Sequence, residues 1–230
     1  PSRASLKYDG AFIRNDKLRY AEYLDDVKAG KKEIKAGTLY PYDIVRDILN
    51  NQVKDNHDQL WNALPNYLEG NEHSGLCVVD VSSSMLNSYQ TDHNVKPINV
   101  SISLGLYIAE RNKNELFGNS FITFSQTPHL EQVKGDDIVS KVHHLSEAEW
   151  GYNTDLQAVF DLILGTAKVN NATNNDIPDV LYIISDMEFD EAVCGELHRR
   201  IKKTNFEVFE KNLMKLDILC QRLSFGMLTA

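Results

Sequence analysis

The sequence predicts an α/β protein: a three-layer, doubly wound and mostly parallel sheet with helices on both faces, preceded by a short helical segment. Three short apolar runs, at 76–79, 121–124 and 180–184, are separated by stretches in which apolar side chains recur at helical spacing. Such runs are typical of strands that are buried on both faces of a parallel sheet. Residues 1–72 contain no long apolar run, so the sheet is expected to begin after them.

The N-terminal segment is polar and is expected to hold helices joined by short connectors. One helix is predicted over 17–28, where apolar side chains fall on roughly one face. A second is predicted to start at a cap on Thr38 and to run to about Asn51. A third is predicted over 58–64, and Pro65 interrupts it because proline cannot continue a helix.

Strands and helices alternate after residue 73, which implies parallel strands joined by crossover helices. The expected elements are, in order, strand 76–79, helix 97–111, strand 121–124, a returning hairpin strand in 129–133, helices 136–144 and 155–169, strand 180–184, and helices over most of 191–215.

The composition excludes several classes of protein. Hydrophobic residues make up 42% and charged residues 25% of the 230, which is ordinary for a globular chain. No apolar run is long enough to span a membrane, and the net charge of −9 argues against a broad nucleic-acid footprint. The 3 cysteines lack metal-ligand spacing and fit a reducing compartment, so a cytoplasmic location is expected. Cys77 lies within an apolar run and is expected to be buried.

Two of the predicted strands end in an aspartate. Asp80 follows the first strand and Asp186 follows strand 180–184, and the first strand also leads into Ser82 and Ser84. Ligands of open parallel sheets bind beyond the carboxyl ends of the strands, so both carboxylates are expected to face one crevice. Carboxylate and hydroxyl oxygens together suit a hard divalent cation such as Mg²⁺. The alternative interpretation is that these residues only cap helices and shape loops.

Residues 80–84 read Asp-Val-Ser-Ser-Ser and resemble the Asp-x-Ser-x-Ser signature of the von Willebrand factor A domain. That family holds a divalent cation at a metal-ion-dependent adhesion site, completed by a threonine on a later loop and an aspartate after the fourth strand. A threonine and an aspartate stand in these places, while Ser83 replaces the glycine that is common in the signature. The resemblance implies a Mg²⁺ or Mn²⁺ site whose ligands are Asp80, Ser82, Ser84, Thr154 and Asp186.

Longer stretches resemble a narrower family, the domain of unknown function 2828, in which a helical region precedes a von Willebrand A-like domain. The resemblance covers roughly residues 17–215, and its motifs lie at 23–30, 122–125, 150–157, 159–164 and 185–190. The layout is similar to that of the Ro autoantigen (TROVE) proteins, in which helical repeats bind RNA. Only the end of such a helical region is expected here, so the resemblance does not carry RNA binding over to this chain.

Three parts are therefore expected: a helical segment 1–72 that ends a larger helical region, an incomplete von Willebrand A-like domain 73–215, and an atypical tail 216–230. The family pattern requires a fifth and a sixth strand, which the tail does not resemble, so the domain is expected to be truncated at its C-terminal side. We expect the tail to be helical or irregular. Strand 180–184 would then be an edge with unpaired backbone groups, and the chain would be poorly stable.

The leading functional hypothesis is a non-catalytic interaction module whose bound cation is completed by an Asp or Glu of a partner protein, with no membrane involved. One alternative is a ribonucleoprotein component of the TROVE type, which would need RNA bound by a longer helical region. A less favoured alternative is a Mg²⁺-dependent phosphohydrolase like the haloacid dehalogenases. Those enzymes need a second aspartate two positions after the first, and Ser82 occupies that position. No enzymatic activity is therefore expected.

Overall fold

The computed structural model describes residues 2–70, 73–86, 95–123, 127–148, 156–173 and 176–185, together with the backbone of 224–227. Its elements are α1 (Ser2–Lys28), α2 (Pro41–Leu49), α3 (His57–Asn62), β1 (Gly75–Val79), the short 3₁₀ helix η1 (Ser83–Leu86), α4 (Pro97–Arg111), β2 (Ser120–Thr123), β3 (Leu130–Gln132), α5 (Ile138–Ser146), α6 (Leu156–Val169), β4 (Val180–Ile184) and β5 (Ser224–Met227).

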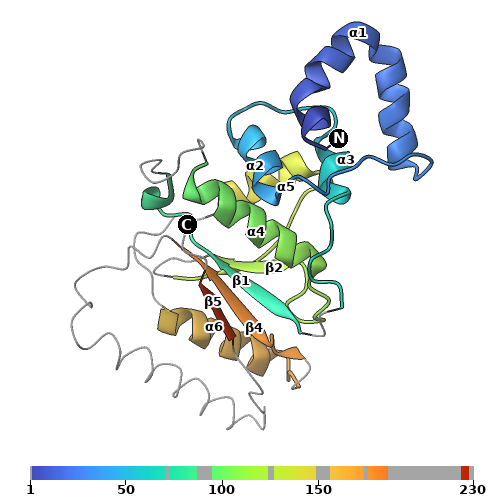
Figure 1. Ribbon diagram of the computed structural model, residues 1–230. Coiled ribbons are helices and arrows are strands. Elements are labelled where there is room, and N and C mark those ends of the chain that lie inside the picture. The colour runs from blue at the N-terminus through green and yellow to red at the C-terminus, as the bar shows by residue number, and fades with distance from the viewer. Residues whose placement is uncertain are drawn as a thin grey trace.

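The described strands form one sheet in the order β3-β2-β1-β4-β5, with β1 at its centre (Figure 1). β1 pairs in parallel with both β2 and β4, and β4 pairs in parallel with β5. Only β3 runs antiparallel, as the return strand of a hairpin with β2. The predicted α/β class with a mostly parallel sheet is thus confirmed, as is the hairpin in 129–133.

β1 is central because its side chains are apolar on both sides. Leu76 and Val78 join a core that includes Val159 and Phe160 of α6. Cys77 and Val79 point the other way, into a core that includes α4 and α5. Figure 1 shows α4 and α6 on opposite sides of the sheet. The alternation follows from the two-residue period of a strand, and it buries Cys77 completely, as the sequence predicted.

The helices α2 and α3 pack onto the outer side of α4 and share its core. Ile44 and Ile48 of α2 and Leu60 of α3 are all 0% exposed and lie in the same cluster as Ile102 of α4 and Val142 of α5. α4 therefore has apolar neighbours on two sides, the sheet and the N-terminal helices. That placement explains why its sequence is apolar almost all the way round.

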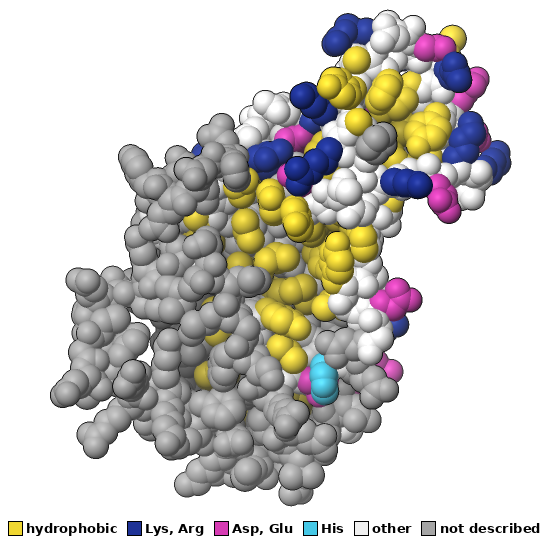
Figure 2. Space-filling view, in the orientation of Figure 1, with side chains coloured by type: hydrophobic (Ala, Val, Ile, Leu, Met, Phe, Trp, Pro, Cys, Tyr) yellow, Lys and Arg dark blue, Asp and Glu magenta, His cyan; other side chains and the backbone are white. Residues whose placement is uncertain are grey.

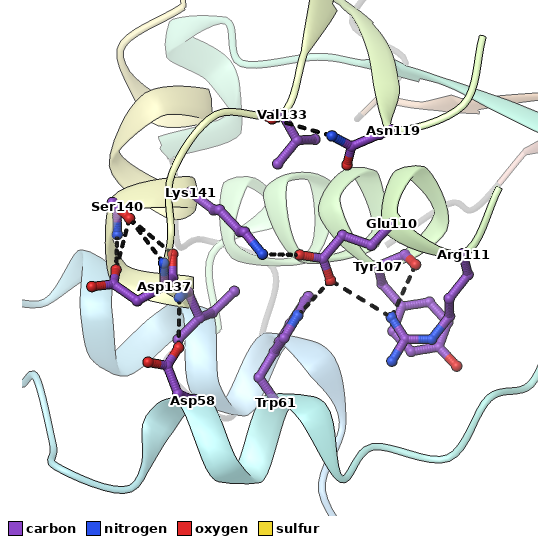
Figure 3. A network of polar contacts seen from close by, with 11 residues as sticks. Asp58, Trp61, Tyr107, Glu110, Arg111, Asn119, Val133, Asp137, Ser140 and Lys141 are labelled. Atoms are coloured by element: carbon purple, nitrogen blue, oxygen red, sulfur yellow. Dashed lines mark hydrogen bonds and ion pairs between the residues drawn. The ribbon is translucent and has the colours of Figure 1, made fainter. Parts of the chain in front are cut away.

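A polar network reinforces this junction (Figure 3). The Glu110 carboxylate of α4 accepts a hydrogen bond from the indole N–H of Trp61 in α3, at 2.7 Å, and one from the ammonium of Lys141 in α5, at 2.8 Å. Asp58 of α3 also accepts the backbone N–H of Ile138 at 2.7 Å, which satisfies one of the free donors at the start of α5. Three helices are thus tied together around one carboxylate.

α1 consists of two helices that meet at Asp16, where φ of −158° and ψ of 79° are not helical. The second half is the helix predicted over 17–28, which is thus confirmed, whereas the first half, from Ser2, was not predicted as a separate helix. The hydroxyl of Tyr20 donates to Asp9 across the bend, at 2.8 Å. Space-filling Figure 2 shows hydrophobic side chains among Lys and Arg on this N-terminal part, and the large exposed apolar residues of α1 are Tyr8, Phe12 and Leu18. Within the described ranges, no helix is both long and apolar enough to cross a membrane.

α2 does not start at the predicted cap. It begins at Pro41 with Tyr40 as the preceding cap residue, and the Asp43 carboxylate accepts the Tyr40 backbone N–H at 3.0 Å. The prediction of a cap at Thr38 is wrong, because an acid inside the first turn reaches back to the free donor. Pro41 suits the first turn, where its missing N–H costs nothing.

The prediction for the tail is wrong at residues 224–227. These residues form β5 in parallel register with β4, from Val180 opposite Ser224 to Ile183 opposite Met227, so β4 is not an edge strand. The physical reason is that the open side of β4 offers a row of backbone donors and acceptors, and any extended segment can satisfy them. The rest of the tail and the helices expected within 191–215 lie outside the described residues.

Candidate functional site

The candidate site lies where β1 and β4 end side by side. Val79 is in register with Ile184, and the backbone N–H of Asp80 donates to the Ile184 carbonyl at 3.0 Å. Strand pairing therefore continues one residue past β1, to Asp80 itself. This geometry fixes the backbone from which the first predicted carboxylate projects.

The Asp80 side chain is held by a hydrogen bond on each of its oxygens. Oδ1 accepts the backbone N–H of Ser82 at 2.9 Å, and Oδ2 accepts the hydroxyl of Ser185 at 2.6 Å. Asp80 is only 2% exposed. Removing a carboxylate from water is costly unless donors or a cation compensate, and these two donors supply part of that compensation.

The hydroxyls of Ser82 and Ser84 lie next to each other. Their Oγ atoms are 3.0 Å apart, and both side chains are half-buried. The backbone carbonyl of Ser82 accepts the backbone N–H of Met85 at 3.1 Å, which closes the turn into η1. Two neighbouring oxygens around an octahedral Mg²⁺ ion are about 2.9 Å apart, given bond lengths of about 2.0–2.1 Å. The hydroxyl pair therefore has the spacing of two adjacent ligands.

Ser101 of α4 also contacts the ends of β1 and β4. Its hydroxyl lies 2.8 Å from the Asp80 carbonyl oxygen, to which it donates, and 3.4 Å from that of Ile184. Ser101 is 0% exposed. Asn99 and Ser103 of α4 are polar and buried as well, so no signal in the sequence distinguished Ser101.

Two family models match the chain. The model of a domain of unknown function (DUF7788) matches residues 74–216, which is more than half of the chain. The chain belongs to this family. The model of a second domain of unknown function (DUF2828) matches residues 1–72. The resemblance to DUF2828 is thus confirmed for the helical segment. The motifs after residue 74 that were assigned to it instead lie in the DUF7788 match.

The chain is also similar to a viral protein, the uncharacterized protein L728 of Acanthamoeba polyphaga mimivirus. The two are 29% identical over 242 residues, an alignment that covers 97% of this chain and 40% of the viral protein. The chain therefore spans less than half the length of this relative.

The structure brings together three of the five predicted ligands within the DUF7788 domain, Asp80, Ser82 and Ser84. The other two, Thr154 and Asp186, lie outside the described residues. Across the described ranges, no cluster of three or more His, Cys, Asp or Glu side chains is arranged to hold a metal ion. One acid and two hydroxyls would therefore need further oxygen ligands.

The alternative interpretation, that these residues only shape a loop, can be compared with the contacts. A carboxylate that accepts the backbone N–H two residues later, as Asp80 does from Ser82, forms a common local turn, so this bond does not distinguish the two interpretations. The bond from Ser185 is different, because it joins residues 105 positions apart. Sequence reasoning missed Ser185 as a site residue, although it directly precedes the predicted ligand Asp186.

Proposed function

We propose that the DUF7788 domain is a three-layer, von Willebrand A-like module that binds a divalent cation, Mg²⁺ or Mn²⁺, and uses it to engage an acidic group of a partner protein. The single observation that carries the proposal is the pair of hydroxyls, 3.0 Å apart, beside a buried carboxylate. The proposed ligands are Asp80, Ser82, Ser84, Thr154 and Asp186.

The chemistry of these groups suits a cation that remains partly open. Mg²⁺ binds oxygen, prefers octahedral geometry and usually keeps several waters, so it needs few protein carboxylates. With two acids and several neutral hydroxyls, the ion would not be surrounded by excess negative charge. A carboxylate from a partner could therefore replace a bound water and be attracted to the ion.

The support differs between the two ligands that lie outside the described residues. For Asp186 the support, besides the resemblance, is its position in the sequence directly after Ser185, whose hydroxyl donates to the Asp80 carboxylate. For Thr154 the support is the sequence resemblance alone. The proposal therefore depends most on Asp80, Ser82 and Ser84.

A non-catalytic role fits these groups better than phosphate-ester hydrolysis. The hydrolase resemblance needs an acid at position 82, but that residue is a serine whose hydroxyl pairs with Ser84.

Calorimetry with Mg²⁺ and with Mn²⁺ tests the proposal. We expect the wild-type chain to bind one ion, and Asp80→Ala and Ser84→Ala to lower the affinity at least tenfold. Ser74→Ala is the matched control, because it removes a serine hydroxyl bound to a carboxylate, that of Asp179, at the opposite end of β1 and β4. Failure of the wild-type chain to bind either ion at millimolar concentration would contradict the proposal.

The partner is tested by capture from a cell extract with the chain as bait. Partners of the proposed kind bind in Mg²⁺, are released by EDTA, and are absent with the Asp80→Ala bait. A short peptide rich in Glu should compete with these partners for the metal site. Partners that survive both EDTA and the substitution would show that capture does not use the metal.

A further inference from the structure

We infer that Ser185 is a positioning residue of the candidate metal site: its hydroxyl holds the Asp80 carboxylate in the orientation that serves the cation. The inference rests on the proposed function, since it gives a role to a residue beyond the five proposed ligands. It comes from the contacts of Asp80.

The bond between the two side chains is short, buried and not local. Ser185 Oγ lies 2.6 Å from Asp80 Oδ2, and the two residues are 7% and 2% exposed. They directly follow different strands, β1 and β4, and are 105 residues apart in sequence. A bond of this kind cannot arise from turn geometry, and donors to an ionised oxygen give stronger hydrogen bonds than neutral pairs do.

Ser185 acts on the side chain of Asp80 and not on its backbone. The backbone is fixed independently, because its N–H donates to Ile184 and its carbonyl accepts the Ser101 hydroxyl. The other carboxylate oxygen, Oδ1, accepts the Ser82 backbone N–H as its one hydrogen bond within the described part of the chain. Removal of the Ser185 hydroxyl therefore leaves the strand ends joined but frees the carboxylate to rotate about one remaining bond.

Rotation matters because the Ser82 and Ser84 hydroxyls are on the neighbouring turn. A carboxylate held at both oxygens keeps one orientation at the start of that turn. A loosened one must be ordered again whenever a cation binds, and the free energy of that ordering is subtracted from the binding energy.

The structure offers a closely matched control at the other end of the same two strands. Ser74 Oγ donates to Asp179 Oδ2 at 3.0 Å, and these residues are also 105 positions apart. The two serine–aspartate pairs thus clamp β1 to β4 at opposite ends. Only the pair at the carboxyl end adjoins the hydroxyls of Ser82 and Ser84.

The test is Mg²⁺ affinity by calorimetry for the wild-type chain, Asp80→Ala, Ser185→Ala, Ser185→Thr and Ser74→Ala. We expect Ser185→Ala to weaken Mg²⁺ binding by about tenfold or more, the usual effect of losing a hydrogen bond to a charged group. Ser185→Thr keeps the hydroxyl and should restore affinity to within about threefold, and Ser74→Ala should leave it within about twofold, thresholds set well inside that loss.

Three results would overturn the inference: Ser185→Ala binds Mg²⁺ like wild type, Ser185→Thr is as weak as Ser185→Ala, or Ser74→Ala loses as much. If Ser185→Ala does not fold, Ser185→Cys replaces it under the same thresholds, since the thiol is close in size but a weak donor. If wild type and Asp80→Ala bind equally, or neither binds, the proposed function itself has failed. An Asp80-dependent site that ignores Ser185 rejects the inference alone.

Discussion

The two faces of the sheet are covered by different parts of the chain. On one face, α4 and α5 share a hydrophobic core with Ile44 of α2 and Trp61 of α3, which lie in the DUF2828 match. On the other face, the core contains α6 residues such as Phe160 and none from residues 1–72. One core therefore combines residues of both family matches, whereas the other core is built from the DUF7788 match.

This difference is visible in the helices that lie directly on the sheet. None of the residues of α4 is exposed, because the sheet and the N-terminal helices cover it from both sides (Figure 1). Among the described residues, α6 packs into a core on its sheet side, and Val169 at its end is 81% exposed. The two regions matched by different families therefore stabilise each other through a shared core.

The largest effect is expected from a chain that starts at His73. It would lose five completely or almost completely buried side chains, each worth about 1.5–3 kcal/mol, out of a total stability of about 5–15 kcal/mol. Those side chains are Ile44, Val45, Ile48, Leu60 and Trp61. We expect no cooperative melt by circular dichroism.

The control for this deletion is a chain that starts at Leu39, which lacks α1 but keeps α2 and α3. It should melt cooperatively, because residues before Leu39 contribute only Leu6, Ile34 and Ala36 to the buried members of that core, with Tyr23 and Val27 packed against it. If the chain from His73 melts at the same temperature as the full chain, the two faces do not differ in the way proposed here.

Most elements around the sheet could be predicted because each carries its own pattern. The predicted bounds of β4, Val180–Ile184, and of α4, Pro97–Arg111, agree with the structure. The packing of α2 and α3 onto α4 could not be predicted, since an apolar stripe shows that a helix buries a face but not against which partner. The first half of α1, before Asp16, was not predicted as a separate helix because that stretch is largely polar.

The candidate site was predictable only as far as its motif extends. The spacing of Asp80, Ser82 and Ser84 predicted that they share one turn. In the structure the two serine hydroxyls lie 3.0 Å apart, and the Ser82 backbone N–H donates to the Asp80 carboxylate. Ser101 and Ser185 were not predicted as part of it. Their roles depend on which strand ends adjoin, and strand order is a long-range property that no local spacing encodes.

An intermediate effect is expected from the pH dependence of the DUF2828 side of the core. Burial, and to a lesser degree the charge of Lys54, lower the pKa of His57 from 6.5 to about 4, while Asp47 acts weakly in the opposite direction. The imidazole Nδ1 accepts the Lys54 backbone N–H, and Nε2 has no hydrogen-bond partner within the described part of the chain. The folded state therefore holds His57 neutral.

The sign follows from proton linkage. Between pH 6.5 and about 4 the unfolded chain binds more protons at His57 than the folded chain does, so stability falls as the pH falls, by up to about 3 kcal/mol. Urea unfolding at several pH values should show this slope in wild type and a shallower one in His57→Asn, whose side-chain oxygen can still accept from Lys54. The exposed His73→Asn should keep the wild-type slope. Equal slopes in wild type and His57→Asn would contradict the prediction.

The smallest effect separates the two faces through one glycine on each helix. A Cβ on Gly105 of α4 would lie 2.6 Å from Cγ2 of Val79 and 3.7 Å from Cδ1 of Leu145. A Cβ on Gly165 of α6 would meet nothing within 4 Å. Gly105→Ala should therefore destabilise by about 1–3 kcal/mol through overpacking, reduced by alanine's better helix propensity.

Gly165→Ala should instead stabilise by about 0.5–1 kcal/mol, because alanine loses less backbone entropy in a helix and nothing opposes its methyl group. Urea unfolding of both variants beside wild type measures the two changes. The opposite signs are the decisive result: Gly105 lets α4 approach β1 closely beneath a second layer of helices, whereas α6 has room on its outer side. Two stabilising substitutions would mean that Gly105 of α4 is not packed tightly against Val79 of β1.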